Sequence, residues 1–146
     1  MIRKFKTKDL IEVMEIWLST NIKAHDFISR DYWEGNFDMV KGMLPGAELY
    51  VCELDDKIGG FIGIDRGYIA GIFVSNDMQS KGMGKQLLER AKELYPELSL
   101  TVYQKNRKAV NFYHREQFQI KQKQIDENTS EIEYLMVWSR KNNESI

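Results

Sequence analysis

The chain has 146 residues, of which 42% are hydrophobic and 29% are charged. This length predicts one domain that buries its own core, and the composition excludes a disordered chain. The 21 basic and 22 acidic residues leave a formal charge of −1. So balanced a charge argues against a protein that coats nucleic acid through a broad basic surface.

Cysteine usage and the N-terminal residues suggest where the protein works. A single thiol, Cys52, excludes an internal disulfide and a cysteine-rich metal site, so we expect it to be a small buried side chain. No group of His, Asp and Glu shows metal-ligand spacing, and no metal is expected. Residues 1–6 lack an apolar signal core, and no stretch approaches roughly 18 apolar residues. We therefore expect a cytoplasmic protein with no membrane segment.

The N-terminal third combines a short strand with two helices. Alternating apolar and basic residues predict a strand over residues 2–6. Thr7 is predicted to cap a helix of about 15 residues, because apolar side chains recur at helical spacing from Leu10. Ser29 is predicted to cap a second helix, which ends at Pro45.

The rest of the chain alternates between strands and helices. Strands are predicted over residues 48–54, 57–65, 68–74, 98–103, 118–125 and 131–138, and helices over residues 82–94 and 106–116. The order β-α-α-β-β-β-α-β-α-β-β predicts an α/β (α+β) fold with a mixed sheet. We expect a single domain over residues 1–140, followed by a short polar tail, residues 141–146.

The segment after strand 68–74 is the most informative, because an apolar strand there leads into a glycine-containing loop that opens a helix. Such a loop points unpaired backbone N–H groups at one place and predicts a phosphate or pyrophosphate site. A Walker A loop is excluded, because Gln79 and Gln86 replace its glycine and its hydroxyl residue. A dinucleotide-binding loop is excluded, because Leu87 replaces its third glycine. The alternative is a tight strand-to-helix turn with no ligand.

A third phosphate-binding pattern, Q/R-x-x-G-x-G/A, matches residues 79–84 at every fixed position. A second block, N-x-x-A-x-x-F/Y-Y, is matched by Asn106 through Tyr113. In this order of elements, the two patterns resemble the GNAT (Gcn5-related N-acetyltransferase) superfamily over essentially the whole chain. Residues 24–28, Ala-His-Asp-Phe-Ile, are similar to a segment of its small bacterial YjaB-type branch. Gln117 departs from the pattern, since the family usually has glycine there.

The resemblance implies a GNAT fold with splayed central strands and an acetyl-CoA-dependent N-acetyltransferase. A primary amine, from a small molecule or a peptide, would attack the thioester directly. The residues implied to bind acetyl-CoA are the backbone of Ile72, Phe73 and Val74, the loop residues Gln79, Ser80, Lys81, Gly82, Met83, Gly84 and Lys85, and also Asn106 and Tyr113. A plain N-cap is the alternative for Asn106. Gly71 is expected either to host the bulge that opens the sheet or to pack under an aromatic ring.

Tyr113 is the predicted general acid, because the family places this tyrosine at the sulfur of CoA and a phenol can donate to a departing thiolate. It lies two helical turns after Asn106, so both side chains project from one helix face. The alternative is a core aromatic side chain.

The general base is less defined by the sequence. Many relatives place Glu, Asp or His near the start of the strand predicted here over residues 68–74, but this sequence has Tyr68 and Ala70 there and so departs from the pattern. His25 is the predicted base, because histidine titrates near neutrality, and a helix-end residue bonded to backbone is its alternative. Asp26 and Glu48 are weaker candidates.

The acceptor pocket is expected to be aromatic. The predicted substrate-binding residues are His25, Phe27, Trp33 and Tyr68. Two rival functions are a non-catalytic acyl-CoA-binding sensor and a structural interaction domain. We expect no nucleic-acid or membrane partner, and a monomer or a homodimer.

Overall fold

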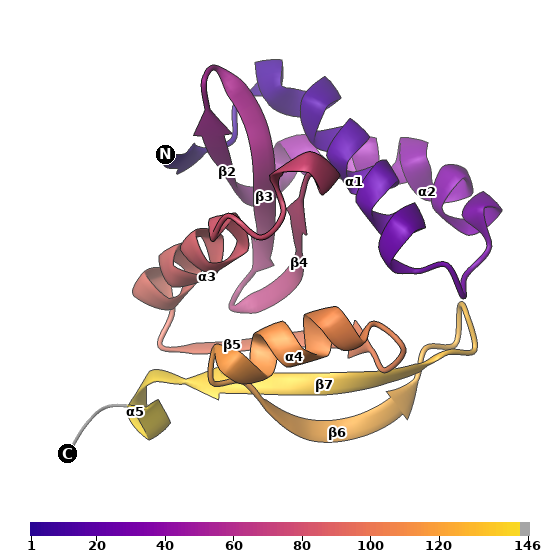
Figure 1. Ribbon diagram of the computed structural model, residues 1–146, viewed down its shortest axis with the longest axis vertical. Helices are drawn as coiled ribbons and strands as arrows, with labels where there is room; N and C mark the ends of the chain where they lie inside the picture. Colours follow the sequence, from indigo (N-terminus) through magenta and orange to yellow (C-terminus); the bar gives the residue numbers. More distant parts are fainter. Residues whose placement is uncertain (144–146) are drawn as a thin grey trace.

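The structure is a computed structural model that describes residues 1–143, with side chains up to residue 141. One seven-stranded sheet forms its centre, in the order β1-β2-β3-β4-β5-β7-β6 (Figure 1). The strands are β1 (Ile2–Lys4), β2 (Glu48–Leu54), β3 (Lys57–Asp65), β4 (Tyr68–Val74), β5 (Glu97–Tyr103), β6 (Gln119–Ile125) and β7 (Ile132–Ser139). The helices are α1 (Leu10–Ala24), α2 (Arg30–Met43), α3 (Met83–Leu94), α4 (Arg107–Arg115) and the short α5 (Arg140–Asn143). The predicted fold class is confirmed.

Helices cover both faces of the sheet (Figure 1). Successive strand residues alternate between the faces and so divide between two apolar cores. Phe61 packs with Val13 of α1 in one core, while its neighbour Ile62 packs with Leu87 of α3 in the other. Cys52 belongs to the second core and is buried, as expected.

Tight turns join β2, β3 and β4 into an antiparallel meander. Asp55 and Asp56 both have positive φ, of 53° and 63°, and Arg66 and Gly67 have φ of 50° and 87°. Two consecutive residues with positive φ are the mark of the turns whose twist matches a hairpin. The predicted strands therefore pair in the order in which they occur.

The start of α1 differs from the prediction that Thr7 caps it. Residues 7–9 form a 3₁₀ turn, and the α-helix begins at Leu10. The buried carboxylate of Asp9 accepts from the backbone N–H of Lys6 at 2.8 Å and from Arg3 at 2.8 Å. The Thr7 prediction is wrong because this charge-assisted pairing is stronger than a hydroxyl cap.

Strands β4 and β5 are parallel but barely joined. Within the described chain, Tyr68 and Ile69 are the residues of β4 that pair with β5, and nothing after Ile69 does. We call the unpaired part, residues 70–74 of β4 and residues 101–103 of β5, the β4–β5 gap. It confirms the predicted splay of the central strands.

A β-bulge lies where the gap begins. The register between β3 and β4 shifts at Ala70, one residue before the predicted position at Gly71. A bulge bends its strand and increases the local twist, which turns the end of β4 away from β5. Gly71 packs under the ring of Phe73, with which an added Cβ would collide. The bulge and the ring contact are thus both present on neighbouring residues.

The predicted polar tail, residues 141–146, begins inside α5. Residues 144–146 lie outside the described part of the chain.

Candidate active site

The loop between β4 and α3 presents a row of backbone donors. Within the described chain, no backbone amide of residues 79–85 donates a hydrogen bond. Ser80 and Gly82 have φ of 67° and 80°, left-handed values of the kind that form anion-binding backbone concavities. Met83 turns its side chain into the core, and Gly84 packs toward α4. With the positive end of the α3 dipole behind it, this loop has the donors and the field of an anion site.

The side chain of Gln79 fixes the loop from two directions. Its Nε2 donates to the carbonyl of Val74 at 3.0 Å, and its Oε1 accepts from Lys108 at 3.1 Å. Lys81 and Lys85 are exposed beside the loop. The predicted cofactor residues after β4 therefore lie together, with three lysines around them.

Among the described residues, three hydrogen bonds between two side chains join the two halves of the molecule, which are β1–β4 with α1–α3 and β5–β7 with α4. They are Gln79 with Lys108 (3.1 Å), His25 with Asn106 (3.2 Å) and Tyr68 with Thr101 (2.9 Å). We call them the cross-gap pairs. Side chains thus connect the halves where the backbone pairing of β4 and β5 stops, and side-chain bonds can be exchanged for bonds to a ligand without breaking a strand.

Asn106 is the N-cap of α4, as the alternative for this residue predicted. Its Oδ1 accepts from the backbone N–H of Ala109 at 3.3 Å. Its Nδ2 lies 3.2 Å from Nε2 of His25.

His25 lies in a cluster of aromatic rings. It stacks on Trp33 with 5.3 Å between ring centroids and meets Tyr103 and Phe27 edge-on at 5.2 Å and 5.7 Å. Its backbone N–H donates to Asn21, the helix-end contact that the sequence offered as an alternative. Three of the four predicted substrate-binding residues are therefore brought together.

Burial in this cluster lowers the pKa of His25 to about 4, although the nearby charge of Asp26 raises it. The imidazole is therefore neutral at pH 7. Within the described residues, its buried Nδ1 and the buried Nε1 of Trp33 have no hydrogen-bond partner.

Sequence reasoning did not single out Tyr103, which completes the cluster. Its hydroxyl donates to Asp126 at 2.6 Å and so ties the cluster to the loop between β6 and β7. The available signal was its place as the last residue of a strand, three residues before the cap Asn106.

Tyr113 lies under α4 and is 8% exposed, between Phe112 and Phe118. Burial raises its pKa above the ordinary value, and the nearby phenol of Tyr68 raises it further. Its hydroxyl has no hydrogen-bond partner among the described residues. Tyr113 is thus both a core aromatic residue and a protonated donor without an acceptor.

The remaining candidates lie apart from the aromatic cluster. Tyr68 is at the closed end of the β4–β5 gap, where it bonds Thr101. Glu48 accepts hydrogen bonds from Tyr50 and Tyr95, and Tyr95 follows the C-terminal end of α3. Glu48 is therefore at the end of α3 opposite to the loop.

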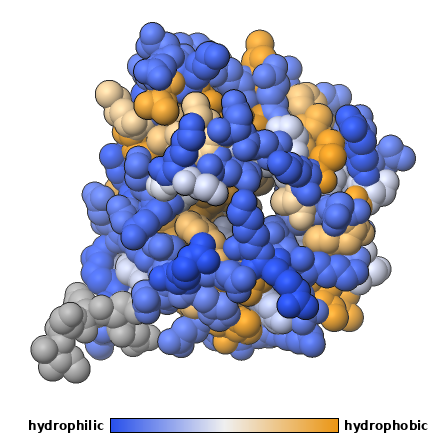
Figure 2. Space-filling model, in the orientation of Figure 1, coloured by the Kyte–Doolittle hydropathy of each residue, from blue (hydrophilic) through white to orange (hydrophobic). Residues whose placement is uncertain are grey.

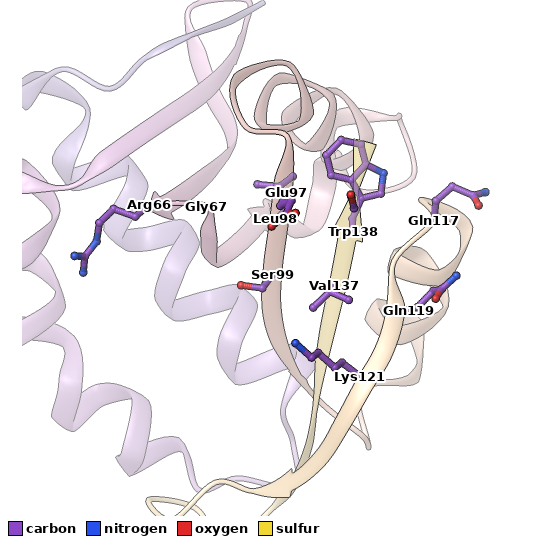
Figure 3. A pocket seen from close by; sticks show the side chains of 11 residues that line it. Arg66, Gly67, Glu97, Leu98, Ser99, Gln117, Gln119, Lys121, Val137 and Trp138 are labelled. Atoms are coloured by element: carbon purple, nitrogen blue, oxygen red, sulfur yellow. The ribbon is translucent and has the colours of Figure 1, made fainter. Parts of the chain in front are cut away.

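A hollow of about 460 Å³ lies on the sheet beside the first residues of β5, far from Asn106 at the other end of that strand. Figure 3 shows Ser99, Val137 and Lys121 on three neighbouring strands of this hollow. None of the predicted site residues lines it. The side of the molecule seen in Figure 1 is mostly hydrophilic, with apolar surface in a recess near its centre (Figure 2).

Among residues 1–143, no three His, Cys, Asp or Glu side chains lie together as a metal site would need. No helix in that range has the length and hydropathy to cross a membrane.

A family profile described as an acetyltransferase (GNAT) domain matches residues 19–134, which include residues 79–85, here called the anion loop, and also Asn106 and Tyr113. The chain belongs to the GNAT acetyltransferase family. The predicted family and the predicted enzyme class, an N-acetyltransferase, are confirmed.

Curated GNAT relatives match nearly the whole chain. Peptidyl-lysine N-acetyltransferase YiaC of Escherichia coli is 34% identical over 140 residues, which cover 94% of this chain and 96% of the relative. Peptidyl-lysine N-acetyltransferase YjaB of Escherichia coli is 31% identical over 121 residues, covering 82% of each chain.

Solved structures show the same fold. The solution structure of apo YjaB from Escherichia coli has a TM-score of 0.85 and 27% identity, and covers 94% of this chain and 96% of that one. The structure of yncA from Salmonella typhimurium, a putative acetyltransferase solved with its cofactor acetyl-CoA, has a TM-score of 0.69 and 15% identity. It covers 100% of this chain and 95% of yncA.

Proposed function

We propose that this GNAT protein transfers the acetyl group of acetyl-CoA to a lysine side chain of a peptide or protein. The observation that carries the proposal is the row of unpaired backbone amides over residues 79–85 beside the β4–β5 gap. The diphosphate of CoA is an anion that such a row binds. The peptidyl-lysine activity named for YiaC and YjaB supports the acceptor class, and the acetyl-CoA bound to yncA supports the donor.

The residues present fit acetyl-CoA. The amides of residues 79–85 would hold its diphosphate, with Lys81 and Lys85 adding positive charge. The backbone of Ile72, Phe73 and Val74 pairs with β3 on one side and has no β5 partner on the other. The backbone groups on that free side would bind the pantetheine arm, as they would bind a strand.

Bound acetyl-CoA would supply a thioester whose carbonyl carbon forms a bond to the amine nitrogen while the C–S bond breaks and the sulfur leaves as a thiolate. Tyr113 would give its phenolic proton to that thiolate. Its phenolate would then regain a proton from solvent, which also takes up the second proton that the nitrogen loses as the amide forms. A phenol is protonated at neutral pH, and the burial that raises the pKa of Tyr113 keeps it so. The proton of the lysine ammonium, whose pKa is about 10.4, passes to solvent before attack. The prediction that His25 is the general base stays a prediction, and the contact of its Nε2 with Asn106 favours a positioning role instead.

The acceptor side is formed by the aromatic cluster. Phe27 and Trp33 would bind the lysine-bearing segment, because aromatic rings pack well on an aliphatic stem and attract its charged end. Direct contact of His25 with the acceptor stays a prediction. Tyr68 would bind near the closed end of the gap, next to Tyr113.

Replacing one hydroxyl tests this proposal. Tyr113→Phe should lower kcat by about 100-fold, the size of a lost general acid, while the Kd for CoA stays unchanged. Tyr95→Phe removes a hydroxyl that bonds Glu48 away from the gap, so it should leave both values unchanged. CoA release is measured with acetyl-CoA and lysine peptides, and mass spectrometry locates the acetyl group.

Each alternative function has its own outcome. CoA binding without turnover on any peptide or amine would indicate an acyl-CoA sensor. Turnover on free amines but not on peptides would make the acceptor a small molecule. No binding of CoA at millimolar concentration would contradict the proposal and favour an interaction domain. Cytoplasmic location and the monomeric or homodimeric state stay predictions.

A further inference from the structure

The orientation of the Asn106 side chain is set by two contacts. Its Oδ1 accepts from the backbone N–H of Ala109, as an N-cap oxygen must. The carboxamide oxygen is therefore on the side of α4, and the nitrogen Nδ2 is the atom that lies 3.2 Å from His25. A flipped amide would place Nδ2 against the Ala109 N–H, with two donors facing each other.

This orientation decides which tautomer His25 has. An amide nitrogen only donates, so Nε2 of His25 must be the acceptor and the ring proton is on Nδ1. Protonation of Nε2 would remove the acceptor and break the contact. The low pKa of the buried ring keeps it in the neutral, accepting form throughout the physiological pH range.

The His25 ring cannot easily move away from Asn106. Trp33 stacks on one face, while Phe27 and Tyr103 contact it edge-on. Its backbone N–H is bonded to the last turn of α1 at Asn21. A ring so confined is a fixed acceptor, whereas a general base must reach the substrate amine.

The Asn106 amide has one more hydrogen to offer. Nδ2 carries two hydrogens, and within the described residues only the His25 contact uses one of them. The side chain is half-buried at the first turn of α4, between the two halves that the β4–β5 gap separates. The second hydrogen is thus a fixed donor next to the gap.

We propose that His25 is a positioning residue, whose Nε2 holds the Asn106 carboxamide so that its second Nδ2 hydrogen is presented to an amide carbonyl of the pantetheine arm. This inference rests on the proposed function, because it needs acetyl-CoA in the β4–β5 gap. It gives His25 a role in cofactor affinity and leaves the chemical step to other groups. The two roles differ in which kinetic constant they change.

The first experiment separates the positioning role from the base role. His25→Phe keeps an aromatic ring and removes the acceptor, so Kd for CoA and KM for acetyl-CoA should rise about 5–10-fold, the effect of one hydrogen bond. The kcat at saturating acetyl-CoA should change less than twofold. His25→Gln restores an accepting oxygen and should bring Kd back to within about threefold of the native value. His114→Phe, on the exposed side of α4, is the matched control and should change neither constant.

A double substitution tests whether His25 acts through Asn106. Asn106→Ser keeps a good N-cap oxygen and removes the amide hydrogens, so it should also weaken CoA binding. Adding His25→Phe to Asn106→Ser should weaken it no further. Independent, additive losses would overturn the proposal.

The free protein offers a readout that needs no cofactor. The ring nitrogen signals of His25 in NMR spectra should report the Nδ1–H tautomer at pH 7, and Asn106→Ser should shift the Nε2 signal. An Nε2–H tautomer would overturn the proposal. So would a fall in kcat with unchanged Kd in His25→Phe, which would restore the base role and leave the proposed function intact. Failure of the native protein to bind CoA would instead contradict the proposed function.

Discussion

Gly82 is the residue at which the anion loop can be tested most directly. It is the N-cap of α3 and has φ of 80° and ψ of 7°. An added Cβ would have no heavy atom within 4 Å, so Gly82→Ala creates no clash. The whole effect is therefore the cost of a left-handed backbone at a residue with a Cβ.

That cost can be estimated from general values. A left-handed conformation destabilises an L-residue by roughly 1–2 kcal/mol. Alanine in place of glycine offsets about 0.4–1 kcal/mol of this, because it lowers the conformational entropy of the unfolded chain. The net loss for Gly82→Ala should be about 1 kcal/mol, which lowers Tm by roughly 2–4 °C for a domain of about this size. If the backbone relaxes instead, an amide of the loop turns away, and the affinity for CoA should fall about tenfold.

The assay combines thermal unfolding with titration of CoA. Gly42→Ala is the matched control, because Gly42 is in α2 and its added Cβ also meets open space, but at an ordinary helical φ. It should raise stability by up to about 1 kcal/mol and leave CoA binding unchanged. A Gly82→Ala variant with native Tm and native Kd would show that the left-handed turn is not needed, and the reasoning about this loop would be wrong.

Other parts of the structure give two more predictions. Gly60→Ala would place a Cβ 2.8 Å from the carbonyl oxygen of Phe73, so β3 and β4 must move apart. The free energy of unfolding, measured with urea, should fall by about 1–3 kcal/mol. A variant as stable as the native protein would mean that β4 moves freely there. His25 makes stability depend on pH, because its pKa of about 4 in the folded protein lies below its ordinary value of 6.5. As the pH falls, the unfolded chain therefore binds a proton at His25 before the folded protein does. The free energy of unfolding should fall by up to about 3 kcal/mol between pH 6.5 and 4. The charged or titratable groups facing the ring are Asp26, which opposes the lowering of the His25 pKa, and Tyr103, which is neutral in this range. In His25→Phe the loss of stability between pH 6.5 and 4 should shrink by this amount. An unchanged pH dependence of the free energy of unfolding would contradict the lowered pKa of His25.

The local structure follows from short stretches of the amino-acid sequence. The tight turns at 55–56 and 66–67, the caps at Ser29 and Asn106, and the glycine loop at 79–84 depend on backbone preferences of neighbouring residues. Hydrophobic periodicity determined the helices and strands for the same reason, because the side chains of one element share a face. The cap at Thr7 was misjudged, since the partner that outcompeted it, Arg3 bound to Asp9, depends on the packed β1 strand.

The assembly of the site depends on contacts between residues far apart in the chain. His25 and Asn106 are 81 residues apart, and Tyr68 and Thr101 are 33 apart, so no local pattern reports either pair. The same holds for Tyr103 beside the His25 ring and for the end of β4 pairing after Ile69. The low pKa of His25 arises from burial by α2 and β5, and burial is a property of the packed chain rather than of the residue. A histidine that reads as a base in sequence can thus become a neutral hydrogen-bond acceptor once its neighbours exclude water.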